Sequence, residues 1–147
     1  DEAKPLYERA IEIYEKVYDP NHPHVATGLN NLAGLLEEQG KYDEAKPHIE
    51  RALRICEEML GPNHPDVATD LNDLAELLED QGKYDEAKPL FERAIKIGEK
   101  TLGPNHPDVA TTLNNLAGLL RNQGKFGEAM PLFQRALNIR EEKLGPN

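Results

Sequence analysis

The sequence predicts an all-α protein, an α-solenoid built from antiparallel helix pairs. Two observations lead to this prediction. The first is a tandem repeat, because His22, His64 and His106 are spaced by 42 residues and the segments 64–105 and 106–147 agree at 28 of 42 aligned positions. The second is the period of the apolar residues inside each repeat, which is typical of helices. Units of this kind stack on their neighbours and bury a shared core between them.

The repeat divides a single domain, residues 1–147, into four segments. Residues 1–21 align with the second half of a unit and should form one orphan helix, and three complete units follow at 22–63, 64–105 and 106–147. Residue 1 aligns inside a unit, and the chain has no initiator methionine. We therefore expect a fragment of a longer array, or a designed one.

The first helix of a unit is clearest in the middle one. Val67, Leu71, Leu74 and Leu78 recur at i, i+4, i+7 and i+11, which places them on one face of an α-helix. A His-Pro step comes just before this pattern, and proline suits the first helical position, where its missing N–H is not needed. Gly82 follows the pattern, and glycine readily takes the left-handed conformation that ends many helices.

The second helix of the same unit should extend from about Asp85 to Leu102. Its apolar face includes Phe91, and the small Ala94 lets the two helices of the unit approach closely. We expect Pro89 at the end of the first turn, where it is tolerated or causes a slight kink. The connections are short, which predicts that consecutive helices pack antiparallel.

Composition narrows the function. The net charge of −10 argues against nucleic-acid binding, which needs clustered lysine and arginine. By direct count the four segments carry −3, −3, −5 and +1, so a partner attracted by charge should be basic and should meet the middle of the chain first. We expect no membrane partner, since no apolar run could cross a bilayer and no signal peptide is present. The single cysteine, Cys56, excludes an internal disulfide and suggests a reducing, cytoplasmic environment.

The last unit contains, in order, the motifs Leu113-Asn114-Asn115-Leu116-Ala117, Gln123-Gly124-Lys125-Phe126, Glu128-Ala129 and Arg135-Ala136-Leu137. These motifs resemble the tetratricopeptide repeat (TPR), in the 42-residue version of kinesin light chains and their bacterial relatives. The resemblance covers the whole chain, with Leu113 in place of the tryptophan of the shorter version. It implies a right-handed superhelix in which the first helices of the units line a concave face and the second helices form the outside.

Members of this family hold an extended peptide or a partner's helix in the concave groove. The resemblance therefore implies a protein-interaction scaffold with five groove positions in each unit. These are Thr27, Asn30, Gly34, Glu37 and Glu38, then Thr69, Asn72, Glu76, Glu79 and Asp80, then Thr111, Asn114, Gly118, Arg121 and Asn122. In the middle unit, positions 69, 72, 76 and 79 form a polar stripe opposite the leucines. Asparagine can bind peptide main chain through its donor and acceptor, the acids favour lysine or arginine, and the glycines leave room for a bulky side chain.

Plainer interpretations of the same positions stay open. The acidic stripe could be an ordinary solvated face, and one asparagine of each pair could bond across the interface between units, with Asn31 and Asn115 the expected structural members. The alternative function is a consensus-like or engineered structural array without a ligand, which the near-identity of the units favours. Partner binding is favoured because the differences between the last two units gather on the polar side of the first helix.

Nothing in the sequence indicates an enzyme or a cofactor. The chain has no glycine-rich phosphate loop, no nucleophile elbow and no zinc-binding helix. Equivalent histidines should stand about 10 Å apart, the helix packing distance, whereas zinc needs about four converging ligands, so we expect no metal site. We interpret Cys56 as a filler of the interface between units. Both ends present faces suited to a neighbouring unit, which predicts weak end-to-end association.

Overall fold

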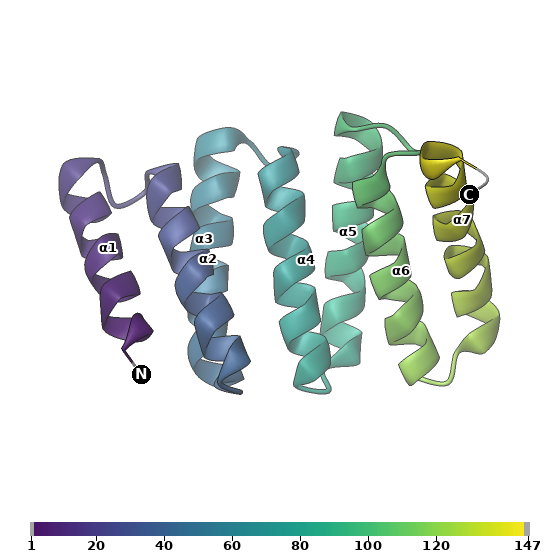
Figure 1. Cartoon of the computed structure of the whole chain (residues 1–147), viewed down its shortest axis with the longest axis horizontal. Helices are drawn as coiled ribbons and strands as arrows, with labels where there is room; N and C mark the ends of the chain where they lie inside the picture. The colour runs from purple at the N-terminus through teal and green to yellow at the C-terminus, as the bar shows by residue number, and fades with distance from the viewer. Residues whose placement is uncertain (1, 146–147) are drawn as a thin grey trace.

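The computed structural model describes residues 2–145, which form a row of seven helices with no strand in that range (Figure 1). The helices are α1 (Ala3–Val17), α2 (Pro23–Glu38), α3 (Tyr42–Leu60), α4 (Pro65–Asp80), α5 (Tyr84–Thr101), α6 (Pro107–Asn122) and α7 (Phe126–Leu144). Each helix packs on the helices before and after it, and α4 also contacts α6. The all-α solenoid of helix pairs that the sequence predicts is therefore confirmed, with α2, α4 and α6 as the first helices of the three units.

A histidine caps the first helix of every unit. His64 Nδ1 accepts a hydrogen bond from the backbone N–H of Asp66 at 3.0 Å, and Pro65 is the first residue of α4. His22 and His106 cap α2 and α6 in the same way. The first N–H groups of a helix have no partner within the helix, so each imidazole satisfies one of them. This cap explains the histidine of the His-Pro step, whereas the sequence had explained only the proline.

The first helices end at the glycines that the sequence indicates. Gly82 has a φ of +77°, a left-handed conformation in which a β-carbon would be strained. Its N–H donates to the carbonyl of Glu79, and the N–H of Lys83 donates to the carbonyl of Leu78, both at 2.8 Å. This pair of bonds satisfies two carbonyls of the last helical turn and returns the chain sharply into α5.

The second helices begin slightly earlier than expected, and this moves their proline. Helix α5 starts at Tyr84, so Pro89 is its sixth residue and lies in the second turn rather than at the end of the first. In that position the proline deprives the carbonyl of Asp85 of its helical N–H partner. Prolines occupy the same sixth position in α3 and α7.

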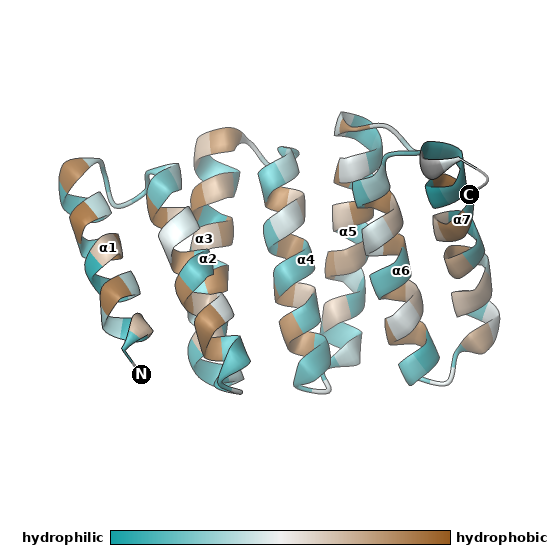
Figure 2. Cartoon of the chain, in the orientation of Figure 1, coloured by the Kyte–Doolittle hydropathy of each residue, from teal (hydrophilic) through white to brown (hydrophobic). Residues whose placement is uncertain are grey.

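The core is a continuous layer between the helices. Its largest fully buried side chains include Leu29, Leu71, Phe91 and Leu113, one or more from each unit. Figure 2 shows apolar and polar residues interleaved along every helix, as expected of helices that bury one face. Because each unit packs on its neighbours, the positions of the first helices relative to one another depend on the interfaces between units.

Arginines fasten the second helices of neighbouring units together. Arg93 donates to Glu57 Oε2 at 3.0 Å and to the carbonyl of Pro62 at 3.2 Å, both in the preceding unit. The same ion pair recurs one unit earlier and one unit later as Arg51–Glu15 and Arg135–Glu99. A guanidinium suits this role because its planar set of donors reaches two acceptors at once.

Candidate partner-binding groove

The threonines and glycines expected in the groove occupy equivalent places on α2, α4 and α6. Thr27, Thr69 and Thr111 are exposed, and each hydroxyl donates to the carbonyl of the proline four residues earlier. A β-carbon added to Gly34 or Gly118 would meet nothing within 4 Å. Open space therefore lies in front of both glycines, while the threonine oxygens keep their acceptor capacity.

Two of the expected groove residues on α4 are held by α6. Asn115 donates to Asn72 Oδ1 at 3.1 Å and to Glu76 Oε1 at 3.0 Å. The prediction that Asn115 bonds across the interface between units is therefore confirmed. The same bonds occupy one oxygen each of Asn72 and Glu76.

A further groove pair joins the ends of the same two helices. Asn122 donates to Glu79 Oε2 at 3.0 Å. Side-chain hydrogen bonds from α6 to α4 therefore cross part of the groove, and they fix the spacing of the two helices.

In the first unit the expected roles of the asparagines are reversed. Asn30 donates to Asp70 Oδ1 at 2.8 Å, while Asn31 is exposed. The expectation that Asn31 would be the structural asparagine was wrong, because the acceptor on α4 is Asp70, and this side chain faces Asn30.

Acidic side chains of α2 and α4 gather in what we call the acidic patch, made of Glu37, Asp73, Glu76 and Asp80. Burial, followed by repulsion from Asp80 and Glu76, raises the pKa of Glu37 to about 7. Burial, followed by repulsion from Glu76, Asp70 and Glu37, raises the pKa of Asp73 to about 7. Carboxylates raise one another's pKa in this way when no cation stands between them.

The cations of the chain lie elsewhere. Within residues 2–145, every ion pair between lysine or arginine and an acid lies on α1, α3, α5 and α7. Arg121 of α6 is the cation that acts on Glu79, whose pKa it lowers against the larger effect of burial, and its guanidinium stands 5.8 Å from the centre of the Phe133 ring. The acidic patch itself therefore has no ion-pair partner in this range.

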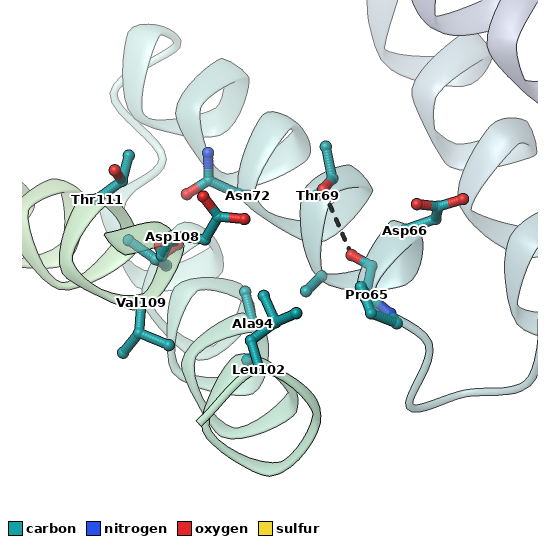
Figure 3. A pocket seen from close by; sticks show the side chains of 12 residues that line it. Pro65, Asp66, Thr69, Asn72, Ala94, Leu102, Asp108, Val109 and Thr111 are labelled. Atoms are coloured by element: carbon teal, nitrogen blue, oxygen red, sulfur yellow. Dashed lines mark hydrogen bonds between the residues drawn. The ribbon is translucent and has the colours of Figure 1, made fainter. Parts of the chain in front are cut away.

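Two equivalent hollows open between the first helices of neighbouring units. The larger, of about 350 Å³, lies between α4, α5 and α6 (Figure 3). In Figure 3, Thr69 and Asn72 stand on one side and Thr111 on the other, with the apolar Ala94 and Leu102 nearby. The smaller hollow, of about 220 Å³, lies one unit earlier, between α2, α3 and α4.

Asp70 lines the smaller hollow, although it was not among the site residues expected from the sequence. It is only 2% exposed, its Oδ1 accepts the bond from Asn30, and its Oδ2 is buried with no nitrogen or oxygen donor. Burial raises the pKa of Asp70, against the hydrogen bonds from Cys56 and Asn30. A signal was present, because Asp70 stands three residues after Val67 and one before Leu71, a place that belongs to the apolar face.

Cys56 fills space at the interface, as expected, and it also contacts a charged neighbour. Burial is the largest cause that raises the pKa of the Cys56 thiol, and repulsion from the Asp70 carboxyl is the next; together they bring it to about 12. A thiol that is buried and protonated is unreactive. Cys56 therefore acts here as a small side chain beside the Asp70 carboxyl.

The two residues at this point form a pair that changes from one interface to the next. We call these the filler pairs: Tyr14 with Gly28, Cys56 with Asp70, and Gly98 with Thr112. At the first interface a β-carbon on Gly28 would lie 2.9 Å from Ile11 Cγ1 and 3.8 Å from Tyr14 Cδ2, so Ile11 leaves little room for a side chain there, while Tyr14 lies at ordinary contact distance. At the third, Gly98 and Thr112 both line the larger hollow.

None of the helices within residues 2–145 is long and apolar enough to cross a membrane. In the same range no three histidine, cysteine or acidic side chains converge as a metal site would require.

Comparison with known proteins agrees with this geometry. A family model described as tetratricopeptide repeat matches residues 1–58, 24–100 and 71–142. A search of curated proteins finds no match. Among solved structures, the chain is similar to BtubC (BKLC) from P. vanneervenii, with 28% identity and a TM-score of 0.89. The similarity covers 99% of this chain and 58% of that protein, so the chain spans less than two thirds of it.

Two further structures show the same arrangement of helices. A kinesin light chain protein of Podosopora anserina with nearly identical TPR-like repeats is 27% identical, with a TM-score of 0.81, over 99% of this chain and 69% of that one. A Rap protein complexed with competence and sporulation factor is 20% identical, with a TM-score of 0.81, over 95% of this chain and 37% of that one. At that identity the last comparison supports the fold alone.

Proposed function

The chain belongs to the tetratricopeptide repeat family, and from this premise we propose that it is a protein-interaction module whose groove holds a basic, extended segment of a partner protein. Its fold is the right-handed α-solenoid typical of the kinesin-light-chain-like members, a protein-interaction repeat fold. The groove is the surface formed by the polar sides of α2, α4 and α6.

The observation that carries this proposal is the acidic patch without a paired cation. Burial first, and repulsion from neighbouring acids second, raise the pKa values of Glu37 and Asp73 to about 7. A lysine or arginine of a partner would relieve this repulsion, so part of the binding free energy would come from ionising the patch. The solvated-face interpretation accounts less well for acids that are half-buried together.

The groove also offers sites for a peptide main chain. Asn114 is half-buried, and its side chain makes no hydrogen bond within residues 2–145, so both the donor and the acceptor of its amide are available. Gly34 and Gly118 leave space in front of the helices for ligand side chains. Contacts of this kind suit an extended peptide held through main-chain bonds and a few side-chain pockets.

The test is enrichment of a random peptide library on the immobilised chain at low and moderate salt. We expect basic, extended peptides, with weaker enrichment at moderate salt because exposed charges are screened. The triple change Glu37→Gln, Asp73→Asn and Asp80→Asn should remove the preference.

The matched control removes the same number of charges from the second helices, as Glu58→Gln, Glu86→Gln and Glu92→Gln. These three acids are exposed and lie outside the groove. Equal loss of enrichment in both triple variants would show only a general charge effect. Absence of any enrichment would contradict the proposal.

The alternative is a structural array without a ligand in this chain. The repeated arginine contacts and the 28 identities between the last two units favour it, because they serve stacking rather than binding. The same library decides between the two functions, since a purely structural array enriches no peptide class.

We also propose weak association between copies through the ends. Leu6 and Val17 of α1 are 69% and 65% exposed, and Phe126 and Met130 of α7 are 62% and 63% exposed. Such apolar faces favour contact with a second copy. Sedimentation from micromolar to millimolar concentration should show a rising average mass, and Leu6→Glu with Val17→Glu should reduce the rise. A constant monomer mass would exclude this association.

A further inference from the structure

The smaller hollow between α2, α3 and α4 has a chemical character that the rest of the groove lacks. Exposed Thr27, Thr69 and Asp66 lie at its mouth, and Asp70 lies buried within it. Its volume of about 220 Å³ is several times the ~30 Å³ that one water occupies in the liquid. The hollow can therefore admit one long side chain from the groove.

Two buried acceptors in this hollow lack a donor. Asp70 Oδ2 and Asn30 Oδ1 are both buried without a hydrogen-bond partner, while Asn30 Nδ2 donates to Asp70 Oδ1 at 2.8 Å. The hydroxyls of Thr27 and Thr69 donate to helix carbonyls and so present only lone pairs to the hollow. A buried acceptor left without a donor costs free energy. The group that fits must bring donors and no acceptor.

The geometry selects among the cationic side chains. Asn30 already uses one lone pair of Asp70 Oδ1, and the carboxyl is buried, which disfavours the two parallel bonds by which arginine grips a carboxylate. A primary ammonium is a compact charge with three donors and no acceptor, so it brings a donor for each of the two unpartnered oxygens. It would also supply the counter-charge that the buried carboxyl lacks.

We propose that the hollow between α2, α3 and α4 is a lysine pocket, in which Asp70 and Asn30 bind the ammonium of one lysine in the partner segment. This pocket deepens the proposed function and rests on it, because it names one position of the bound peptide. The equivalent hollow between α4, α5 and α6 lacks the pocket's chemistry, since Gly98 and Thr112 replace Cys56 and Asp70, and Asn115 already bonds to Asn72 Oδ1.

The pocket can be tested with small probes that imitate side chains. n-Butylammonium, n-propylguanidinium and n-butanol are titrated separately into labelled protein, and NMR records the side-chain amide of Asn30 and the side-chain carboxyl carbon of Asp70. We expect saturable shifts with n-butylammonium, at least tenfold weaker association with n-propylguanidinium, and no saturable shift with n-butanol.

Two variants complete the test. Asp70→Asn removes the charge at nearly constant shape and should weaken n-butylammonium binding at least tenfold, with folding checked by circular dichroism. Glu92→Gln removes a charge from an exposed position of α5, outside the hollow, and should change the affinity less than threefold. Equal binding of the guanidinium, or unchanged binding in Asp70→Asn, would overturn the pocket.

Failure of the lysine pocket can be distinguished from failure of the proposed groove function. If the peptide library yields basic peptides that depend on the acidic patch, but n-butylammonium does not bind at Asp70, the groove function stands and the lysine pocket fails. If n-butylammonium binds at Asp70 while the library yields no peptides, the pocket holds free amines and the proposed function fails.

Discussion

Replacing Asp73 with asparagine should stabilise the protein at pH 8 and leave its stability unchanged below about pH 4. The same position carries Asn31 and Asn115 in the other units, so an asparagine of equal size fits the backbone there. In the middle unit the carboxyl is half-buried beside Glu37 and Glu76, and burial first, then these acids, raise its pKa to about 7. Asparagine removes the charge that this environment disfavours.

The sign and size follow from the pKa. An acid whose folded-state pKa exceeds its unfolded value favours folding below the unfolded pKa, and this contribution is lost as pH rises through the folded pKa. For Asp73 the loss extends from the usual 3.8 to about 7. At ~1.36 kcal/mol per pH unit, the upper limit is about 4 kcal/mol. Because Glu37 and Glu76 titrate together with Asp73 and share the repulsion, we expect about half of this, ~2 kcal/mol, at pH 8.

Urea unfolding followed by circular dichroism at pH 3.5, 5.5, 7 and 8 would measure the effect. The stability difference between Asp73→Asn and the unchanged chain should be near zero at pH 3.5 and grow through pH 7. Glu92→Gln, at an exposed position of α5, is the control and should shift stability by less than ~0.5 kcal/mol at every pH. A gain that is the same at pH 3.5 and pH 8, or a loss at pH 8, would refute the reasoning.

Three further predictions concern the interfaces, caps and glycines. Arg93→Ala should cost about 1 kcal/mol in urea unfolding, because Glu57 and a backbone carbonyl lose their donor, and Arg93→Lys should recover only part of the loss. His64→Ala should lower stability by about 1 kcal/mol in thermal unfolding, and His64→Asn should restore most of it, since asparagine also caps helices well. In calorimetry, Gly82→Ala should destabilise by about 1 kcal/mol at its positive φ, whereas Gly34→Ala should stabilise by up to about 1 kcal/mol, because Gly34 is helical and unobstructed. Equal signs for the two alanine changes would contradict the assignment of Gly82 to the helix end.

Much of the fold could be predicted because repetition multiplies a local signal. The spacing of His64 and Gly82 fixes where α4 begins and ends, and each neighbouring unit supports the same interpretation. The starting point of α5 was predicted one residue too late, since Pro89 fits the first turn by local rules, yet the helix begins at Tyr84. Local preference sets the type of an element better than its limits.

The candidate site was predicted less completely, for a physical reason. Which asparagine bonds across an interface depends on what the adjacent unit places opposite it, and only the structure shows Asp70 facing Asn30. The same holds for Asp73, whose burial results from the stacking of α2 and α4 together. Interactions between units are not encoded in the pattern of one helix, so sequence periodicity cannot assign them.

The filler pairs also have a geometrical consequence for the array. Since contacts join mainly neighbouring units, the curvature of the groove formed by α2, α4 and α6 depends on the tilts at two interfaces, and a third interface sets the tilt of α1. The filler pairs put side chains of different volume at equivalent points of these interfaces: Tyr14 with Gly28, Cys56 with Asp70, and Gly98 with Thr112. A small rotation at one interface displaces the helices beyond it, and this displacement grows with their distance from the interface. Exchanging one pair for another would therefore redirect the far end of the groove while every groove side chain stays on its own helix.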